Sequence, residues 1–481
     1  MSVSDDLHSL QHAIYREAKA TAQPIAQSLA WLVDPRNMQA AWERVRTSAG
    51  ANTPGVDHLS ASSVANRSEA WLRGIASRLC TGEYQFSGVR WLEIPRAGSS
   101  HGAPRRIGIL TLSDRVVHAA LKQVLEPMVD HRFVDDSFGF RAARSVTGAL
   151  DRALHLLNAR HRTTAPFRYL ARLDVADCFE TLQHQRLLQE VSGATADAAV
   201  LQILGNALRA TGMVRGRWWW RRPAGVVQGS SLSPLLCNLY LHGVDLELAR
   251  ASHDGARWRL LRYADDMLLL ADSRRSCRQG VARIAAALRA RGQSLRRSKT
   301  QVTTARDGAS WLGVDIRLGA ADQRYHYLIP TSRLEAMRER IAEMTVPPSE
   351  RIDPAAFDMG RWLGSINEQM MDWWHAYRYA ENGLFVFKQI DEFAVERVGE
   401  LLRSVMGRTW RQVKDEHQVR LPRGFLSWKI QGVTLTLLSS LPPHSPHFLS
   451  RPPLWQMRPK AAAPSAPPSA RPSGNGRAWV E

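Results

Sequence analysis

The stretch LLRYADDMLLLADS, residues 260–273, constrains the fold more tightly than any other part of the chain. Its two apolar runs lie so close together that only a tight turn can join them, which predicts a β-hairpin. The turn carries two adjacent carboxylates, Asp265 and Asp266. Like charges between buried apolar strands are unfavourable unless a cation neutralises them. A solvent-exposed turn is the simpler alternative, because Asp is common in turns.

A further acid, Asp174, ends the apolar strand predicted within LARLDVADCFETL. One acid at a strand end and an acid pair on a neighbouring hairpin supply the hard oxygen ligands that Mg²⁺ prefers, with Mn²⁺ as the alternative ion. Two such ions can activate a 3′-hydroxyl and stabilise a leaving pyrophosphate. A two-metal site that contains Asp174, Asp265 and Asp266 is therefore one interpretation of these acids, and the solvent-exposed turn remains the other.

The chain is strongly basic, with 64 Lys and Arg against 45 Asp and Glu and a formal charge of +19. Most of the basic residues are arginine, which binds phosphate as a bidentate fork and stacks on bases. Nucleic acid is therefore the predicted partner. By charge alone, an anionic membrane surface and an ordinary solvated basic surface are the alternatives.

Targeting and redox signals point to a cytoplasmic protein without a membrane partner. No apolar run is long enough to span a bilayer, and the N-terminal MSVSDDLHSLQH lacks the apolar core of a signal peptide. The cysteines form no C-x-x-C pair, which disfavours a zinc ribbon or a disulfide framework. The thiols predicted to be reduced are Cys80, Cys178, Cys237 and Cys277.

Apolar periodicity predicts mixed helices and strands up to residue 330, and helices without strands beyond it. The helices predicted in the first part are 110–130, 196–211, 276–291 and the segment that Ser233 opens. ASWLGVDIRL is predicted as one strand, and VRGRWWWRRPAGVVQG as a hairpin or an edge strand. The helices predicted in the second part are 331–344, 357–380 and 386–406.

Taken together, these motifs resemble those of the reverse transcriptases, and most closely the bacterial group II intron-encoded type. YADD matches the family's Y-x-D-D hairpin, LDVADCF its first catalytic strand, and QGSSLSPLLCNLYL its Q-G-x-x-x-S-P-L-L-x-N block. SKTQV and WLGVDI match the lysine and L-G elements that follow. The motifs occur in family order, and the resemblance covers roughly residues 30–420.

This resemblance implies an α+β fold: a right-hand polymerase whose fingers and palm have the reverse transcriptase (RT) fold, with an α-helical thumb. The implied divisions are an N-terminal extension, fingers and palm, a maturase-like thumb, a C-terminal extension and a disordered tail, at residues 1–60, 61–330, 331–420, 421–459 and 460–481. The tail is rich in Pro, Ala and Ser and has no apolar pattern to bury.

The resemblance also assigns roles to single residues. The catalytic and metal-binding residues that it implies are Asp174, Asp265, Asp266 and Lys299. Lys299 would lie near the leaving pyrophosphate, with a solvated surface lysine as the alternative. The residues implied for the incoming nucleotide are Arg105, Phe179, Gln228 and Gly229. Arg105 would grip the triphosphate, and Phe179 would exclude a ribose 2′-hydroxyl unless it is an ordinary buried Phe.

Three more residues are candidates for nucleic-acid contact. Arg141 is a candidate either for template contact or for a structural ion pair. Trp219 and Arg221 lie in the unusual RWWWRR segment, where Arg beside Trp fits stacking on nucleic acid, although packing of a hairpin explains the segment equally well. After Gln228 and Gly229 the chain reads SS where the family usually has G-P, and this departure questions the rigidity of the loop.

The implied reaction is RNA-templated DNA synthesis, in which dNTPs extend a DNA or RNA primer. The preferred setting is a group II intron-type protein bound to a dedicated structured RNA. One alternative is a free-standing relative in antiphage (antiviral) defence or CRISPR spacer acquisition. The other is a non-catalytic RNA-binding maturase, against which the intact acids argue.

Overall fold

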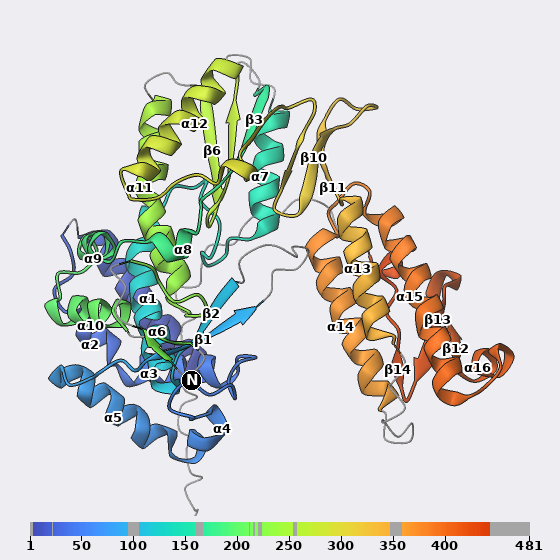
Figure 1. The fold of residues 1–481 in the computed structure, drawn as a ribbon, viewed down its shortest axis with the longest axis horizontal. Coiled ribbons are helices and arrows are strands. Elements are labelled where there is room, and N and C mark those ends of the chain that lie inside the picture. The colour runs from blue at the N-terminus through green and yellow to red at the C-terminus, as the bar shows by residue number, and fades with distance from the viewer. Residues whose placement is uncertain are drawn as a thin grey trace, which may run out of the picture.

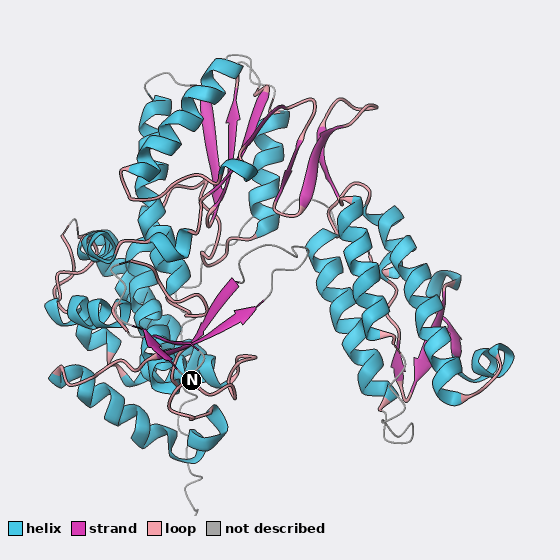
Figure 2. Cartoon of the chain, viewed as in Figure 1, coloured by secondary structure: helices cyan, strands magenta, loops and turns pink. Residues whose placement is uncertain are grey.

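The computed structural model describes residues 3–21, 23–94, 105–159, 167–210, 212–214, 217–219, 224–253, 257–346 and 358–442. Within them, helices surround four small sheets, which agrees with the predicted α+β class (Figure 2). The tail predicted to be disordered, residues 460–481, lies outside the described residues. None of the described helices is long and apolar enough to cross a bilayer.

The N-terminal part packs around one buried helix, α6 (Leu112–Val129), which forms over the predicted segment. Helix α3 (Pro35–Arg46) lies along α6, and at its N-terminus the Asp34 side chain accepts a hydrogen bond from the N–H of Arg36. The other helices here are α1 (Val3–Ala20), α2 (Ser28–Leu32), α4 (Ala61–Val64) and α5 (Ser68–Thr81).

A four-stranded sheet with the order β2-β1-β4-β5 lies against this helical part. Its strands are β1 (Val89–Ile94), β2 (Arg105–Ile109), β4 (Gly212–Val214) and β5 (Arg217–Trp219). Strands β4 and β5 form an antiparallel hairpin, and β5 is the edge strand. The hairpin predicted for the RWWWRR segment is thus confirmed for the described part of that segment.

The second four-stranded sheet, here called the carboxylate sheet, has the order β6-β7-β3-β8 and is antiparallel throughout. Its strands are β3 (Tyr169–Asp174), β6 (Trp258–Tyr263), β7 (Asp266–Ala271) and β8 (Gln301–Thr304). Along β3, Leu170 and Ala171 enter two different apolar clusters, as the alternation of side chains across a strand requires. Both faces of the sheet are therefore buried.

Helices cover both faces of the carboxylate sheet. Helices α11 (Ser233–His253) and α12 (Arg274–Arg289) pack on one face, and α7 (Val146–Asn158) packs on the other. Helices α11 and α12 confirm two predicted helices. The short helix α8 (Cys178–Thr181) follows β3, and α9 (His184–Ser192) and α10 (Ala198–Leu208) complete this region.

The prediction of one strand in ASWLGVDIRL is wrong, because the segment is a hairpin. Strands β9 (Ala309–Trp311) and β10 (Val314–Leu318) are joined by Leu312 and Gly313, whose φ angles are 50° and 84°. Two successive residues with positive φ make the turn that reverses an antiparallel pair, and Gly adopts that conformation at no steric cost. Strand β11 (Tyr325–Leu328) completes this three-stranded sheet.

The described residues 331–346 and 358–442 form a C-terminal bundle, in which three long helices lie side by side (Figure 1). Helices α13 (Thr331–Met344), α14 (Met359–Tyr377) and α15 (Gly383–Met406) confirm the predicted helices. The prediction of helices without strands is wrong, since α16 (Trp410–His417) leads into a small sheet made of β12 (Gln418–Arg420), β13 (Leu426–Ile430) and β14 (Val433–Thr434).

These C-terminal strands are too short to show an alternating pattern, but tertiary packing stabilises them. Trp428 on β13 is 2% exposed and donates its indole N–H to the carbonyl of Val395 on α15. Asn367 on α14 holds the backbone of Thr434 and Thr436 with its side-chain amide. The bundle therefore continues past residue 420, where the sequence predicts a domain boundary.

Candidate functional site

The hairpin made by β6 and β7 brings the predicted carboxylates to one end of the carboxylate sheet. The backbone register sets Asp266 opposite both Tyr263 and Asp174, on the two neighbouring strands. Asp265 lies in the turn, and its carbonyl accepts a hydrogen bond from the N–H of Val175 at 3.4 Å. Three acids from two distant segments thus meet at the end of the sheet, as the sequence predicts.

Asp174 is held by two cations from the segment after α12. Nε of Arg296 donates to Oδ2 of Asp174 at 3.0 Å, and Nζ of Lys299 donates to Oδ1 at 3.3 Å. Arg296 also binds Asp177 at 2.9 Å, so its guanidinium joins two acids of the LDVADCF motif. The predicted lysine is therefore at the site, and Arg296 is a neighbour that the sequence reading missed.

Asp266 is less well compensated than Asp174. The nearest cation is Arg172, whose Nη2 lies 3.6 Å from Oδ2 of Asp266, and the other oxygen, Oδ1, is buried without a hydrogen bond in the structure. Burial raises the pKa of Asp266 to about 6, and the nearby charges of Asp174 and Asp265 act in the same direction against Arg172. The charge of Asp266 is therefore only partly compensated, and one of its oxygens has no hydrogen bond.

The three acids fit a divalent metal chemically, although their side chains do not yet enclose one. Among the described residues, no group of three acidic, His or Cys side chains converges closely enough to form a metal cage. The unbonded Oδ1 of Asp266 and the mutual repulsion of the acids are the features that a hard cation would relieve. Asp174, Asp265 and Asp266 are the residues that would hold it.

A cavity borders the loop that contains Gln228. It is lined by five segments of the chain, including Arg44, Leu110, Arg115, Phe140, Phe179, Gln228, Gly229 and Ser231. Three of the residues predicted to contact the incoming nucleotide therefore share one cavity. Arg44 and Arg115 add positive charge to its lining, and the sequence reading assigned no role to either. The cavity has the mixed polar and aromatic lining that a nucleotide requires.

The loop at Gln228 is fastened to the β1–β2 region by its backbone. The carbonyl of Gln228 accepts a hydrogen bond from the N–H of Gly108 at 2.7 Å. Gly229 has φ +112°, and a Cβ at this position would lie 2.7 Å from the carbonyl oxygen of Gly108. Only glycine fits this combination of conformation and close approach.

Buried hydroxyl groups stabilise the same loop where the family usually has G-P. The hydroxyl of Ser230 lies 2.6 Å from Nδ1 of His118 on α6 and accepts the N–H of Leu232 at 3.2 Å. Ser233 donates its hydroxyl to the carbonyl of Val227 at 2.8 Å. Burial lowers the pKa of His118 to about 4, so the ring is neutral at physiological pH. The loop is therefore held, although by a different device from a proline.

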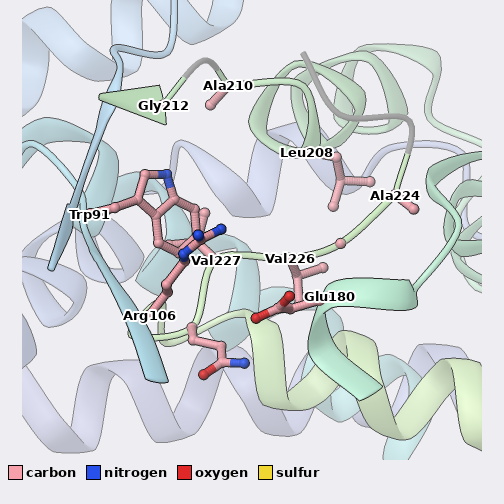
Figure 3. Close-up of a pocket in the computed structure, with 11 residues that line it drawn as sticks. Trp91, Arg106, Glu180, Leu208, Ala210, Gly212, Ala224, Val226 and Val227 are labelled. Carbon is pink, nitrogen blue, oxygen red and sulfur yellow. The ribbon is translucent and has the colours of Figure 1, made fainter. Parts of the chain in front are cut away.

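A second, smaller pocket opens between the β1–β2 sheet and the segment before Gln228 (Figure 3). Trp91 and Arg106 line one side, and Glu180, which follows Phe179 on α8, lines the other. Arg106 pairs with Glu93 across the β1–β2 strands at 3.5 Å. Glu180 and Val227, the chain neighbours of Phe179 and Gln228, therefore line a pocket at the β1–β2 sheet.

The structure favours the structural alternative for Arg141 over template contact. Its side chain is 5% exposed and donates to Oδ1 of Asp130 at 2.8 Å, with further bonds to the carbonyls of Val134 and Ser137. Four of its five N–H groups are bonded within the protein, as a structural ion pair requires. The sequence could not distinguish the two roles of Arg141, because its partners are set by the tertiary packing.

Other predicted residues cannot be placed to the same extent. Arg105 begins β2 and Trp219 ends β5, but the side chains of both lie outside the described part of the chain. Arg221 lies outside the described residues altogether. Arg172, in contrast, had a usable signal: it stands two residues before Asp174 on the same strand and so shares its face.

Comparisons with known proteins agree with this geometry. Residues 94–316 match the family model described as reverse transcriptase (RNA-dependent DNA polymerase). Protein YkfC of Escherichia coli is 28% identical over 325 residues, which cover 60% of this chain and 82% of YkfC. The group II intron-encoded protein LtrA of Lactococcus lactis is 28% identical over 215 residues, which cover 45% of this chain and 34% of LtrA. The Pol polyprotein of the type-1 retrotransposable element R2 from Nasonia vitripennis is 31% identical over 136 residues, only 13% of its length.

Proposed function

Residues 94–316 of this chain are a reverse transcriptase domain, an RNA-dependent DNA polymerase, and from this premise we propose that the chain copies a dedicated structured RNA into DNA as a group II intron-type protein. The observation that supports this most is the register of the carboxylate sheet, which sets Asp174 opposite Asp266 with Asp265 in the adjoining turn. A polymerase needs three such acids at one point, because they hold the metal ions of phosphoryl transfer.

In this proposal the carboxylate sheet is the palm, the β1–β2 region belongs to the fingers, and the C-terminal bundle is the thumb. Asp174, Asp265 and Asp266 would hold two Mg²⁺ ions, with Mn²⁺ as the alternative. Bound metal would supply the Lewis acidity that activates the primer 3′-hydroxyl and stabilises the pyrophosphate.

The chain's own residues would do the rest of the work. Lys299, whose side chain is 53% exposed, can turn from Asp174 to the leaving pyrophosphate, where its charge is needed in the transition state. Phe179 and Gln228 line the same cavity, so the ring can exclude a 2′-hydroxyl while the loop positions the base pair. Arg105 would grip the triphosphate from the start of β2.

The RNA partner is supported by charge and by the relatives. A chain with a formal charge of +19 binds nucleic acid through phosphate contacts and counterion release. LtrA, by its description, is encoded by a group II intron, and this chain spans about a third of its length. Preference for one RNA requires surfaces that read RNA shape, for which the N-terminal helices and the C-terminal bundle are the candidates.

The test of the chemistry is extension of a DNA primer on an RNA template with dNTPs and Mg²⁺. Wild-type protein should extend the primer, and Asp265→Asn should abolish extension while binding the primed template with nearly unchanged affinity. More than a tenth of the wild-type rate in Asp265→Asn would contradict the assignment of the metal ligands.

The test of the partner is to sequence the RNA that copurifies with the protein from its native host. One enriched, structured species is expected, and an intron-like species would support the group II setting. A featureless sample of cellular RNA would contradict a dedicated partner while leaving the polymerase intact.

A further inference from the structure

The residue before the YADD sequence, Arg262, is a fully buried arginine whose five N–H groups all have partners. Nε and Nη2 bind the two oxygens of Asp245 at 2.8 and 2.6 Å. Nη2 also donates to the hydroxyl of Ser137 at 2.8 Å, and Nη1 donates to Oδ1 of Asn238 at 2.8 Å and to the carbonyl of Ala264 at 3.0 Å. A guanidinium has five donors in a rigid fork, and here each one is used.

The bond to Ala264 matters because Ala264 forms the turn that carries the acids. Its φ is +57°, in the left-handed region, which is unfavourable for a residue with a Cβ unless its surroundings enforce it. Arg262 donates a hydrogen bond to the carbonyl of this residue, and Asp265 is the next residue in the chain. The turn is therefore fixed by a group that contacts neither substrate nor the expected metal.

A second segment packs closely against the same turn. Gly139 lies so close that a Cβ there would be 2.3 Å from the backbone nitrogen of Ala264. The carbonyl of Gly139 accepts a hydrogen bond from the side-chain amide of Asn238 at 2.6 Å, and Asn238 in turn accepts from Arg262. Three segments that are far apart in the sequence thus meet in one buried polar network: FGFR (residues 138–141), the Q-G block and RYADD.

The cost of this network shows that stability alone does not explain it. The side chains of Arg262 and Asp245 are 0% and 2% exposed. Desolvating two charges is expensive, and a buried ion pair often contributes no more to stability than apolar side chains of the same volume. Its advantage is a defined geometry, since charged, bidentate hydrogen bonds resist displacement more than apolar packing does.

We propose that Arg262 is a positioning residue of the active site: with Asn238 and Gly139, it holds the left-handed turn at Ala264 so that Asp265 and Asp266 face Asp174. The inference concerns the acids named in the proposed function and rests on it for their catalytic role. Without this hold the turn relaxes, the acids separate, and metal binding weakens. Neither Arg262 nor Ala264 lines the nucleotide cavity, so nucleotide binding should change little.

The test uses the full-length protein with Arg262→Lys, which keeps the charge and the Asp245 pairing but cannot serve five acceptors. Mn²⁺ binding is measured by electron paramagnetic resonance without nucleotide or nucleic acid, alongside kcat and the dNTP KM on primed RNA. Mn²⁺ affinity should fall about tenfold, as for other groups that orient metal ligands. We expect kcat to fall about a hundredfold, because misplaced reacting groups cost that much, with little change in KM.

The matched control is Asp391→Ala in the C-terminal bundle. Asp391 is also a buried charge, and it accepts the N–H groups of Leu438 and Ser439 at 2.7 and 2.8 Å. Its loss should lower the melting temperature and leave Mn²⁺ affinity unchanged. If Asp391→Ala weakens Mn²⁺ binding as much as Arg262→Lys does, general loosening of the fold explains both, and the positioning role is refuted.

A second variant keeps the proposal testable if Arg262→Lys does not fold. Gly139→Ala inserts a methyl group against the nitrogen of Ala264 and should weaken Mn²⁺ binding from the opposite side of the turn. Unchanged Mn²⁺ affinity and kcat in a folded variant of either kind would overturn the positioning role and leave the polymerase assignment standing. Wild-type protein that binds Mn²⁺ but makes no DNA would overturn the polymerase assignment. The positioning role would still stand, because the Mn²⁺ measurement does not require polymerisation.

Discussion

The hairpin turn at Ala264 and the loop at Gln228 both carry predicted site residues, but different kinds of bonds hold them. The turn is held by a buried guanidinium paired with a carboxylate, at 2.6–3.1 Å. The loop is held by neutral groups: a backbone bond from Gly108 and the contact between His118 and Ser230. Both contain a residue with positive φ, so both need support.

The difference follows from what the proposed function requires of each segment, metal binding at the turn and nucleotide contact at the loop. Ligands of a metal must stay within a fraction of an ångström of one another, and charge-assisted hydrogen bonds resist such displacement. A loop over a nucleotide must accept four different base pairs, and neutral bonds of about 1 kcal/mol each permit small adjustments. The comparison therefore predicts that changes at the turn abolish activity and that changes at the loop only modulate it.

The largest expected effect belongs to Asp266→Asn, which should abolish DNA synthesis and yet stabilise the metal-free protein at pH 7.5. Because burial raises the pKa of Asp266 to about 6, the folded protein binds this proton more tightly than the unfolded chain does. Stability is therefore lost as pH rises from about 4 through about 6, by on the order of 2 kcal/mol. The Asn variant does not pay this cost.

The measurement is thermal unfolding in EDTA, for wild type and Asp266→Asn, between pH 4 and pH 7.5. The two melting temperatures should be close at pH 4 and separate above pH 6, with the variant higher. Saturating Mg²⁺ should raise the melting temperature of the wild type alone. A variant that is less stable than wild type at pH 7.5 would show that Arg172 already compensates the charge of Asp266.

A smaller effect is expected for Phe179→Ala, because Phe179 lines the same cavity as Gln228 and carries none of the acids. The backbone carbonyl of Phe179 accepts the N–H of Val226 at 2.8 Å, so the main chain keeps its place when the ring is removed. Discrimination against ribonucleotides should fall by at least about tenfold, because the 2′-hydroxyl no longer meets a ring.

Competition between single dNTPs and rNTPs measures this discrimination. Phe140→Ala is the matched control, because Phe140 is a second Phe that lines the same cavity, with 47% of its surface exposed. Phe140 follows Gly139, whereas Phe179 follows the strand that ends in Asp174. Equal loss of selectivity in both variants would mean that the cavity as a whole, and not Phe179, rejects the ribose.

The smallest effect should come from Ser230→Ala, which removes the contact between the loop and His118. Loss of one buried hydrogen bond of about 1 kcal/mol should raise the dNTP KM roughly fivefold and leave kcat nearly unchanged. Ser276→Ala, which removes the 2.8 Å contact of Ser276 with Ser273 on the distant helix α12, should change neither constant. A large fall of kcat in Ser230→Ala would mean that catalysis depends on the loop as strongly as on the turn, and would contradict the comparison.

Local patterns in the sequence were sufficient for the elements that carry the site. Two apolar runs separated by a few residues can only be a hairpin, and the acids at its turn and at the end of β3 follow from that. The long helices α6, α11, α12 and α13 were equally visible, because their apolar periodicity extends over several turns. The order of the motifs was enough to identify the family, since each motif is local.

Short elements and partner choices were not visible in the same way. Strands β12 to β14 have two to five residues, fewer than a pattern needs, and they form because Trp428 finds a place against α15. Arg141 and Arg262 look alike in sequence, as single arginines beside apolar residues. Both are buried in ion pairs, with Asp130 and Asp245, and only the tertiary packing selects those partners.

By itself, then, the sequence determined which groups the candidate site offers: three acids, a lysine, a Phe predicted to act as an aromatic gate, and a basic chain suited to nucleic acid. Tertiary structure decided what holds those groups in place. Arg262 and its partner Ser137 are 125 positions apart in the chain, and Arg296 and Asp174 are 122 apart. No local pattern encodes such pairs, because the free energy that selects them is gained only when the sheet has brought the two segments together.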